Sequence, residues 1–103
     1  MKRALLTFAA LGVLAASSSV MADEALAKSK NCMACHAIDK KLVGPSYKDV
    51  AKKFGGQKDA EATLVNAVLK GSSGVWGPIP MPANANVNAD EAKKLVTWIL
   101  SLK

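Results

Sequence analysis

The sequence is poor in the groups on which most enzymes and metal sites depend. Its 103 residues include one histidine, two cysteines and only 5% aromatic residues. It contains no Ser-His arrangement and no glycine-rich phosphate loop. No segment alternates like a strand, and no stretch after residue 22 is long and apolar enough to span a bilayer. These absences leave a small helical chain without recognisable catalytic apparatus.

Residues 1–22 have the pattern of a secretory signal peptide. Lys2 and Arg3 precede an apolar run, and the run ends in serines and a small-residue cleavage site at residues 20–22. A transmembrane anchor is the alternative, because the apolar run approaches membrane-spanning length. The serines and the acids at positions 23 and 24 favour cleavage. We therefore expect residues 23–103 to form one exported domain without a stable membrane anchor.

Two cysteines and the single histidine lie together in the chain. Cys32 and Cys35 bracket two residues and His36 follows directly, which is the C-x-x-C-H spacing that attaches a c-type haem. Thiols at this spacing lie on nearly the same side of one helical turn, so both can bond one edge of the macrocycle. The adjacent neutral imidazole can then coordinate the iron. The motif predicts one covalently bound haem c.

Three other sites use a close pair of cysteines. A thioredoxin-like dithiol would need a surrounding βαβ pattern, which is absent. A structural zinc centre would need four well-spaced ligands, and this chain offers two cysteines and one histidine. A structural disulfide needs neither the close spacing nor the neighbouring histidine. The motif and the export signal together favour haem.

Apolar periodicity predicts about four short helices and an all-α fold around the haem. A first short helix would lead to Cys32, a second would end at the glycines 55 and 56, a third would be capped by Asp59 and end at Gly71, and the last would start at a capping box, Asn88 to Glu91. The residues expected to face the core in the last three helices are Tyr47, Val50, Ala51 and Phe54; Leu64, Ala67 and Val68; and Ala92, Leu95, Val96, Ile99 and Leu102.

Residues 71–86 follow a different pattern. Prolines at positions 78, 80 and 82 remove backbone donors and forbid a helix, so a stiff extended loop is expected. Met81 lies within it, either as a hydrophobic plug over a cavity or as an iron ligand.

Elimination favours Met81 as the sixth ligand of the iron. Because His36 is the only histidine, bis-histidine coordination is impossible. Met1 and Met21 would leave with the signal peptide, and Met33 lies inside the attachment motif. A lysine amine or an open position are the alternatives to Met81. A thioether suits low-spin iron and raises the reduction potential.

The chain resembles a known family. Its motifs are similar in order and spacing to those of the cytochrome c-551 family, the small bacterial class I cytochromes c also called cytochrome c8. The resemblance covers residues 23–103 and implies the small class I cytochrome c fold. The matching segments are Cys32–His36, Gly44–Val50 and Gly74–Pro82.

The resemblance assigns roles to three further residues. It implies that the carbonyl of Pro45 accepts a hydrogen bond from the far imidazole nitrogen of His36 and fixes the ring. It implies that Trp76 donates its indole N–H to a haem propionate, although a packing tryptophan remains an alternative. It implies that Asn84 hydrogen-bonds near the sulfur of Met81.

The resemblance also implies a function. Members of the family carry single electrons in the periplasm, notably to the cytochrome cd nitrite reductase of denitrifying bacteria. We therefore expect a monomeric periplasmic carrier, not an enzyme, that receives electrons from a membrane cytochrome complex or another periplasmic carrier. Aromatic residues are not interleaved with the lysines, so nucleic acid is not expected as a partner.

Two functions from other classes remain alternatives. One is a gas sensor or peroxidase-like enzyme with a displaceable sixth ligand, and the other is a structural haem domain docked in a larger complex. Lysines 28, 30, 40, 41, 52 and 53 offer a basic surface that would steer the chain to acidic partners or would simply keep it in solution.

Overall fold

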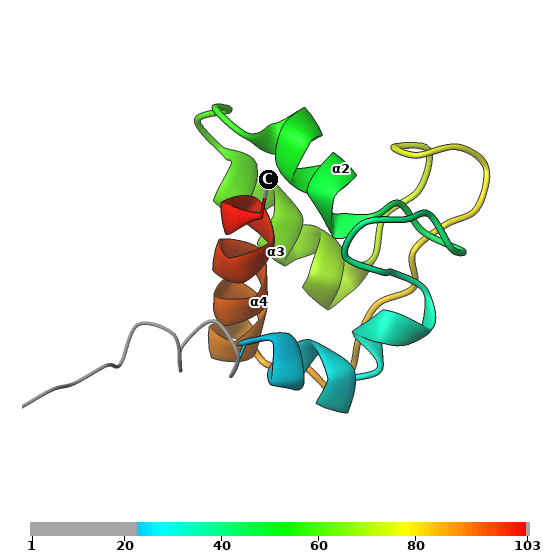
Figure 1. Ribbon diagram of the computed structural model, residues 1–103. Helices are drawn as coiled ribbons and strands as arrows, with labels where there is room; N and C mark the ends of the chain where they lie inside the picture. Colours follow the sequence, from blue (N-terminus) through cyan, green and yellow to red (C-terminus); the bar gives the residue numbers. More distant parts are fainter. Residues whose placement is uncertain (1–22, 103) are drawn as a thin grey trace, which may run out of the picture.

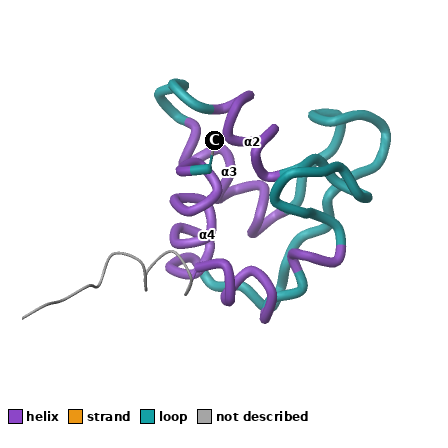
Figure 2. The backbone as a smooth tube through the Cα atoms, viewed as in Figure 1, coloured by secondary structure: helices purple, strands orange, loops and turns teal. Residues whose placement is uncertain are grey.

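The computed structural model describes residues 23–102, so the predicted signal peptide lies outside the described residues. Figures 1 and 2 show a helical domain in which the helices pack together and the long loops lie on one side. The described part of the chain has two isolated β-bridges but no strand, which confirms the all-α prediction. Its helical segments are an N-terminal helix at residues 23–29, the 3-10 helix η1 (Cys32–Ala34), α2 (Tyr47–Phe54), α3 (Ala60–Lys70) and α4 (Ala89–Ser101).

Helix α2 forms as its periodicity predicts. The side chain of Ser46 accepts a hydrogen bond from the backbone N–H of Asp49 at 3.1 Å and so caps the first turn. The helix ends at Gly55, whose N–H returns to the carbonyl of Ala51. Its predicted core face is buried as a set, and that face comprises Tyr47, Val50, Ala51 and Phe54.

Helix α3 starts and ends where expected, but its cap differs. Asp59 occupies the N-cap position, yet its side chain makes no capping hydrogen bond, so the predicted capping role of Asp59 is wrong. Its backbone φ of −106° and ψ of 19° depart from the extended N-cap geometry in which the side-chain oxygen reaches the first turn. Gly71 ends the helix with a φ of 86°, a left-handed conformation that favours glycine.

Helix α4 is the central support of the fold. The predicted capping box is present: the side chain of Asn88 accepts from the N–H of Glu91 at 2.8 Å, and that of Glu91 accepts from the N–H of Asn88 at 3.1 Å. The helix packs on both α2 and α3 (Figure 1). Its buried residues are Ala92, Leu95, Val96, Trp98 and Ile99.

Trp98 was not among the predicted core residues. It is 3% exposed and meets the ring of Tyr47 edge to face, with the ring centroids 5.5 Å apart. The apolar stripe of α4 is therefore wider than the five positions that periodicity indicated.

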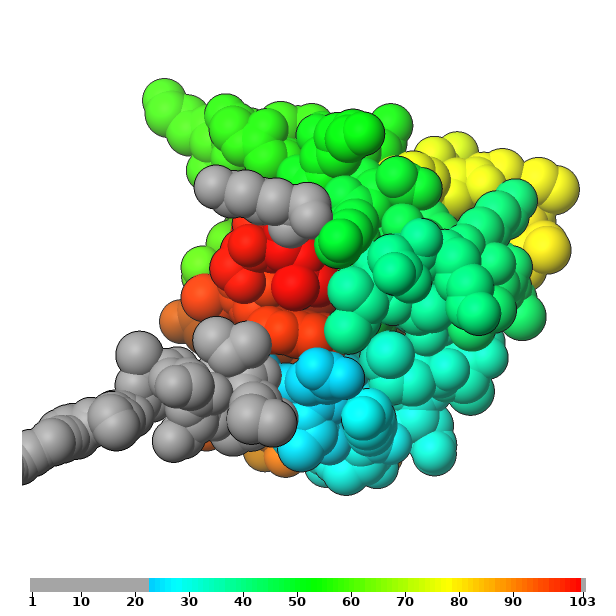
Figure 3. Space-filling model, viewed as in Figure 1, coloured from blue at the N-terminus to red at the C-terminus, as the bar shows by residue number. Residues whose placement is uncertain are grey.

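The loops gather on one side of the domain. In Figure 1 the loop at residues 71–86, in yellow, projects beside the segment between η1 and α2, and the space-filling view in Figure 3 shows the two in contact. Within residues 23–102, no helix is long and apolar enough to cross a membrane.

Candidate functional site

A cavity of about 440 Å³ lies between α3 and the two loop regions. Its volume falls within the usual range for a buried cofactor or ligand site. Most lining side chains are apolar, and Cys35, His36 and Met81 all contribute to the wall. A smaller adjoining cavity of about 90 Å³ is lined by Cys32 as well as by these three residues. The fold thus collects the four residues predicted to hold the haem.

The imidazole of His36 is fixed from three directions. Its Nδ1 donates to the carbonyl oxygen of Pro45 at 2.8 Å, so the hydrogen-bond partner implied by the resemblance is in place. The ring stacks on Tyr47 with centroids 4.8 Å apart and planes 20° from parallel. Because Nδ1 carries the donated proton, Nε2 is the nitrogen left with a lone pair. The ring is therefore prepared to bind a metal through Nε2.

Gly44 approaches the same ring from a third side. A Cβ at this position would lie 2.7 Å from Cε1 of His36, closer than any real contact. A side chain here would require the imidazole to shift, and the φ of Gly44 is not in the left-handed range, so the close approach of His36 is what favours glycine. Sequence reasoning identified the Gly44-Pro45 turn but gave no indication of this contact.

The two cysteines lie at the two ends of η1 and line the small cavity. Asn31 has a left-handed φ of 66° and turns the chain into η1, where the carbonyl of Cys32 accepts from the N–H groups of Cys35 and His36 at 3.3 and 3.1 Å. Both thiols are half-buried and are not joined in a disulfide. Burial raises the pKa of the Cys32 thiol, and the Tyr47 hydroxyl beside it partly offsets this effect.

Tyr47 has a larger role than its place in a core stripe suggested. It is 4% exposed, and burial raises the pKa of its hydroxyl far above the ordinary value, with a further contribution from Cys32. Tyr47 therefore stays neutral and connects the imidazole, the Cys32 thiol and the Trp98 ring. No sequence signal distinguished it from an ordinary core aromatic.

Met81 reaches the cavity through the closure of its own loop. The backbone groups of Ser72 and Met81 exchange two hydrogen bonds of 3.0 and 2.8 Å, so the loop between them is pinched at its base. The side chain of Met81 packs partly buried against the core and lines both cavities. The lysine alternative is represented in the cavity wall by Lys41, whose side chain is exposed.

Trp76 and Asn84 lie at opposite parts of this loop. Trp76 lines the large cavity while 40% exposed, and Nζ of Lys53 lies 5.4 Å from its ring centroid. Asn84 lines the small cavity together with Met81, and its Nδ2 donates to the carbonyl of Val68 at 2.9 Å. Asn84 thus fixes the loop to α3.

The residues present fit a haem. The large cavity is mainly apolar, Cys35, an oriented imidazole and a thioether line its wall, and Cys32 lines the adjoining small cavity. This donor set suits haem iron. A closed zinc site does not fit, because within residues 23–102 no three His, Cys, Asp or Glu side chains converge as metal ligands.

Comparisons with known proteins identify the family of the chain. The family model for cytochrome c matches residues 22–103. Cytochrome c-551 of Pseudomonas aeruginosa is 57% identical over 97% of this chain and 96% of that protein. Cytochrome c-552 of Hydrogenobacter thermophilus is 51% identical over 93% and 97%, respectively. The crystal structure of Nitrosomonas europaea cytochrome c552 matches with a TM-score of 0.76 and 51% identity, over 78% of this chain and 99% of that one.

The fold and the site define a small haem protein of the all-α class I type. The chain belongs to the cytochrome c family. It is an electron carrier with one covalently bound haem c and exchanges electrons with redox partners; it is not an enzyme. The predicted family, fold class and cofactor are confirmed.

Proposed function

We propose that the mature chain is a monomeric periplasmic one-electron carrier whose haem is attached through Cys32 and Cys35 and ligated by His36 and Met81. The observation that carries the proposal is that one cavity is lined by the only histidine and by the one methionine of the proline-rich loop. Removal of residues 1–22 and export are part of the proposal and rest on the signal-peptide pattern.

Neighbouring groups of the chain hold the two ligand atoms in position. Pro45, Gly44 and Tyr47 keep Nε2 of His36 in one orientation. The bridge between Ser72 and Met81 presents the thioether from the other loop. The haem supplies the one-electron chemistry when bound, and a thioether ligand favours the reduced state. Two protein ligands leave no coordination position for a substrate, which supports a carrier over a gas sensor or peroxidase.

The cavity mouth supports a small, transient contact with redox partners. Large apolar side chains are exposed around it, and among them are Val43, Trp76 and Ile79. Weak redox encounters use small interfaces of this kind. We propose the cytochrome cd nitrite reductase as acceptor and a membrane cytochrome complex or another periplasmic carrier as donor, on the strength of the family resemblance.

Potentiometric titration with optical detection tests the ligand set. Wild-type holoprotein should show the near-infrared sulfur-to-iron band when oxidised. Met81→Ala should lose that band and lower the potential by on the order of a hundred millivolts or more, because axial ligation sets much of the haem potential. Met33→Leu is the matched control and should leave both unchanged. An unaltered band and potential in Met81→Ala would refute the assignment.

The salt dependence of the electron-transfer rate tests whether lysines steer the encounter with the proposed acceptor. If lysines steer the encounter, the second-order rate to isolated nitrite reductase should fall as ionic strength passes about 0.1 M. Lys28→Glu should lower that rate and flatten its salt dependence without changing the potential. Lys28 is the suitable probe because it is well exposed, whereas Lys30 makes internal contacts. A rate that responds to neither change would mean that the apolar rim alone recognises the acceptor.

A further inference from the structure

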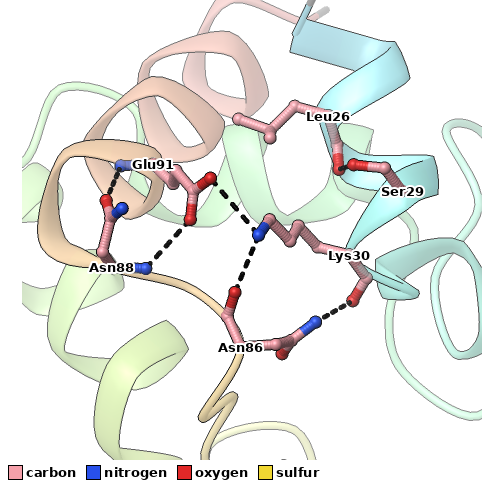
Figure 4. A network of polar contacts seen from close by, with 6 residues as sticks. All are labelled: Leu26, Ser29, Lys30, Asn86, Asn88 and Glu91. Carbon is pink, nitrogen blue, oxygen red and sulfur yellow. Dashed lines mark hydrogen bonds and ion pairs between the residues drawn. The ribbon is translucent and has the colours of Figure 1, made fainter.

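Lys30 contacts Asn86 and Glu91, which lie close to each other in the chain but more than fifty positions from Lys30 (Figure 4). Its Nζ donates to the backbone carbonyl of Asn86 at 2.8 Å and lies 3.3 Å from Oε2 of Glu91. In return, Nδ2 of Asn86 donates to the carbonyl of Lys30 at 3.4 Å. The side chains of Lys30 and Glu91 are only 23% and 26% exposed. We call Lys30, Asn86 and Glu91 the clasp.

The acceptor groups of the clasp are themselves fixed in place. The capping box at the start of α4 uses Oε1 of Glu91 to accept from the N–H of Asn88, which leaves Oε2 facing Lys30. The anchor is therefore a helix end and not a free surface carboxylate. An ammonium with two acceptors of this kind makes charge-assisted hydrogen bonds, which are stronger than neutral ones.

The clasp joins the attachment motif to the segment that follows Met81. On one side, Lys30 directly precedes Asn31, the residue that turns the chain toward Cys32. On the other side, Asn86 lies two residues after Asn84, whose N–H and Nδ2 both donate to the carbonyl of Val68 in α3 at 3.1 and 2.9 Å. Residues 82–86 are thus secured at two points, α3 and the clasp.

We propose that Lys30 is a positioning residue for the distal ligand: through Asn86 it holds the segment after Met81 and so keeps the thioether in place. This inference rests on the proposed ligation by Met81. Among the described residues, the part of the loop between Ser72 and Met81 is hydrogen-bonded only at its base, so the hydrogen bonds that follow Met81 supply much of the restraint on this residue. Loss of the clasp lowers the cost of a local opening in which Met81 leaves.

Ligand displacement in the oxidised holoprotein tests this role. The probe is imidazole, and the rate is followed by loss of the sulfur-to-iron band. Lys30→Met should accelerate displacement roughly tenfold. The loss of about one charge-assisted hydrogen bond changes the equilibrium constant for local opening by about that factor. Lys30→Arg retains donors for both acceptors and should restore a rate near that of wild type.

Lys28→Met is the matched control. It removes the same charge two residues away, but within residues 23–102 Lys28 pairs with Glu24 alone, at 3.5 Å on the exposed face of the N-terminal helix. Its displacement rate should equal that of wild type. Equal rates in Lys30→Met and Lys28→Met, with the band present, would overturn the positioning role and leave the ligand assignment standing. Absence of the band from wild-type protein would overturn both.

Two further measurements separate positioning from general stability. Leu102→Ala weakens packing at the far end of α4, where Leu102 is partly buried, and it should lower the unfolding midpoint with little change in displacement rate. Rates that follow the unfolding midpoint in every variant would overturn the proposal. Should Lys30→Met yield no holoprotein, Asn86→Ala and Glu91→Gln replace it; each should accelerate displacement, and wild-type rates in both would overturn the proposal.

Discussion

The two loop regions that meet at the cavity are held in different ways. The segment between η1 and α2 is tied to its own neighbourhood: Gly44 N–H donates to the carbonyl of Cys35 at 2.7 Å, and Tyr47 N–H donates to that of Ala37 at 2.9 Å. The loop at residues 71–86 is tied at its base and at its C-terminal end, by Ser72, Val68 and Lys30.

The positions of the two proposed ligands therefore depend on different parts of the sequence. His36 is oriented by residues within eleven positions of itself, so we expect its geometry to depend less on distant parts of the chain. Met81 depends on helix α3 and on a lysine that is 56 positions from its hydrogen-bond partner in the loop segment. The methionine side is therefore the one that long-range substitutions should disturb, and the predictions below test this contrast.

The largest effect is expected at the base of the methionine loop. Gly71 has a φ of 86°, and a Cβ there would lie 2.7 Å from the carbonyl oxygen of Met81. Gly71→Ala combines left-handed strain with a backbone clash, so it should lower the free energy of unfolding by about 3 kcal/mol and weaken the sulfur-to-iron band.

Gly74→Ala is its control. Gly74 has a similar φ of 77° but nothing within 4 Å of an added Cβ. Denaturant titration should show a loss of only about 1 kcal/mol, from strain alone, with the band intact. Equal losses in the two variants would contradict the importance of the Met81 contact.

On the histidine side, Gly44→Ala should have the next largest effect. Its φ is ordinary, so the only cost is the contact with His36, and overpacking of this kind typically costs about 1–3 kcal/mol. Because the imidazole must tilt, the potential should change while the sulfur-to-iron band persists. An unchanged potential and stability would show that the ring has room to move.

Substitutions of Tyr47 should have a smaller effect on stability, and two of them distinguish the contribution of the ring from that of the hydroxyl. Tyr47→Phe keeps the stack on His36 and the edge contact with Trp98, whereas Tyr47→Leu removes both. Aromatic pairs contribute about 0.5–1.5 kcal/mol each beyond their buried area, so the leucine variant should be clearly the less stable by denaturant titration. If both variants lose equal stability, the hydroxyl contact with Cys32 is the important one.

The smallest expected effect is on the pH dependence of the free energy of unfolding. Hydrogen bonding from the backbone of Asn88, together with nearby Lys30 and Lys94, lowers the pKa of Glu91 in the folded state. A lowered folded-state pKa contributes stability above the unfolded value of about 4.3, and this contribution is lost as pH falls through the folded value. The stability difference between wild type and Glu91→Gln should therefore shrink below about pH 4. A difference that is constant from pH 7 to pH 3 would contradict an ionised clasp.

Local patterns alone predicted much of this protein. The C-x-x-C-H spacing requires no tertiary information, because its thiols and imidazole lie within five consecutive residues. The core face of α2, the capping box of α4 and the glycine ends of α2 and α3 also arise within single segments. The cap at Asp59 was the exception: the backbone entering α3 takes a geometry in which the side chain does not reach the first turn.

Only the tertiary structure shows which of several residues of the same type make contacts at the site. By pattern, the sequence predicted the helices and the attachment motif, since each follows from residue types at short range, and by elimination among its methionines it led to the prediction of Met81. It could not show that Gly44 contacts the imidazole, that Trp98 faces Tyr47, or that Lys30 is held internally while Lys28 is exposed. The contact of Gly44 depends on how the chain turns between η1 and α2. The contacts of Trp98 and Lys30 join α4 to other segments, so they form only when α4 packs against the rest of the chain.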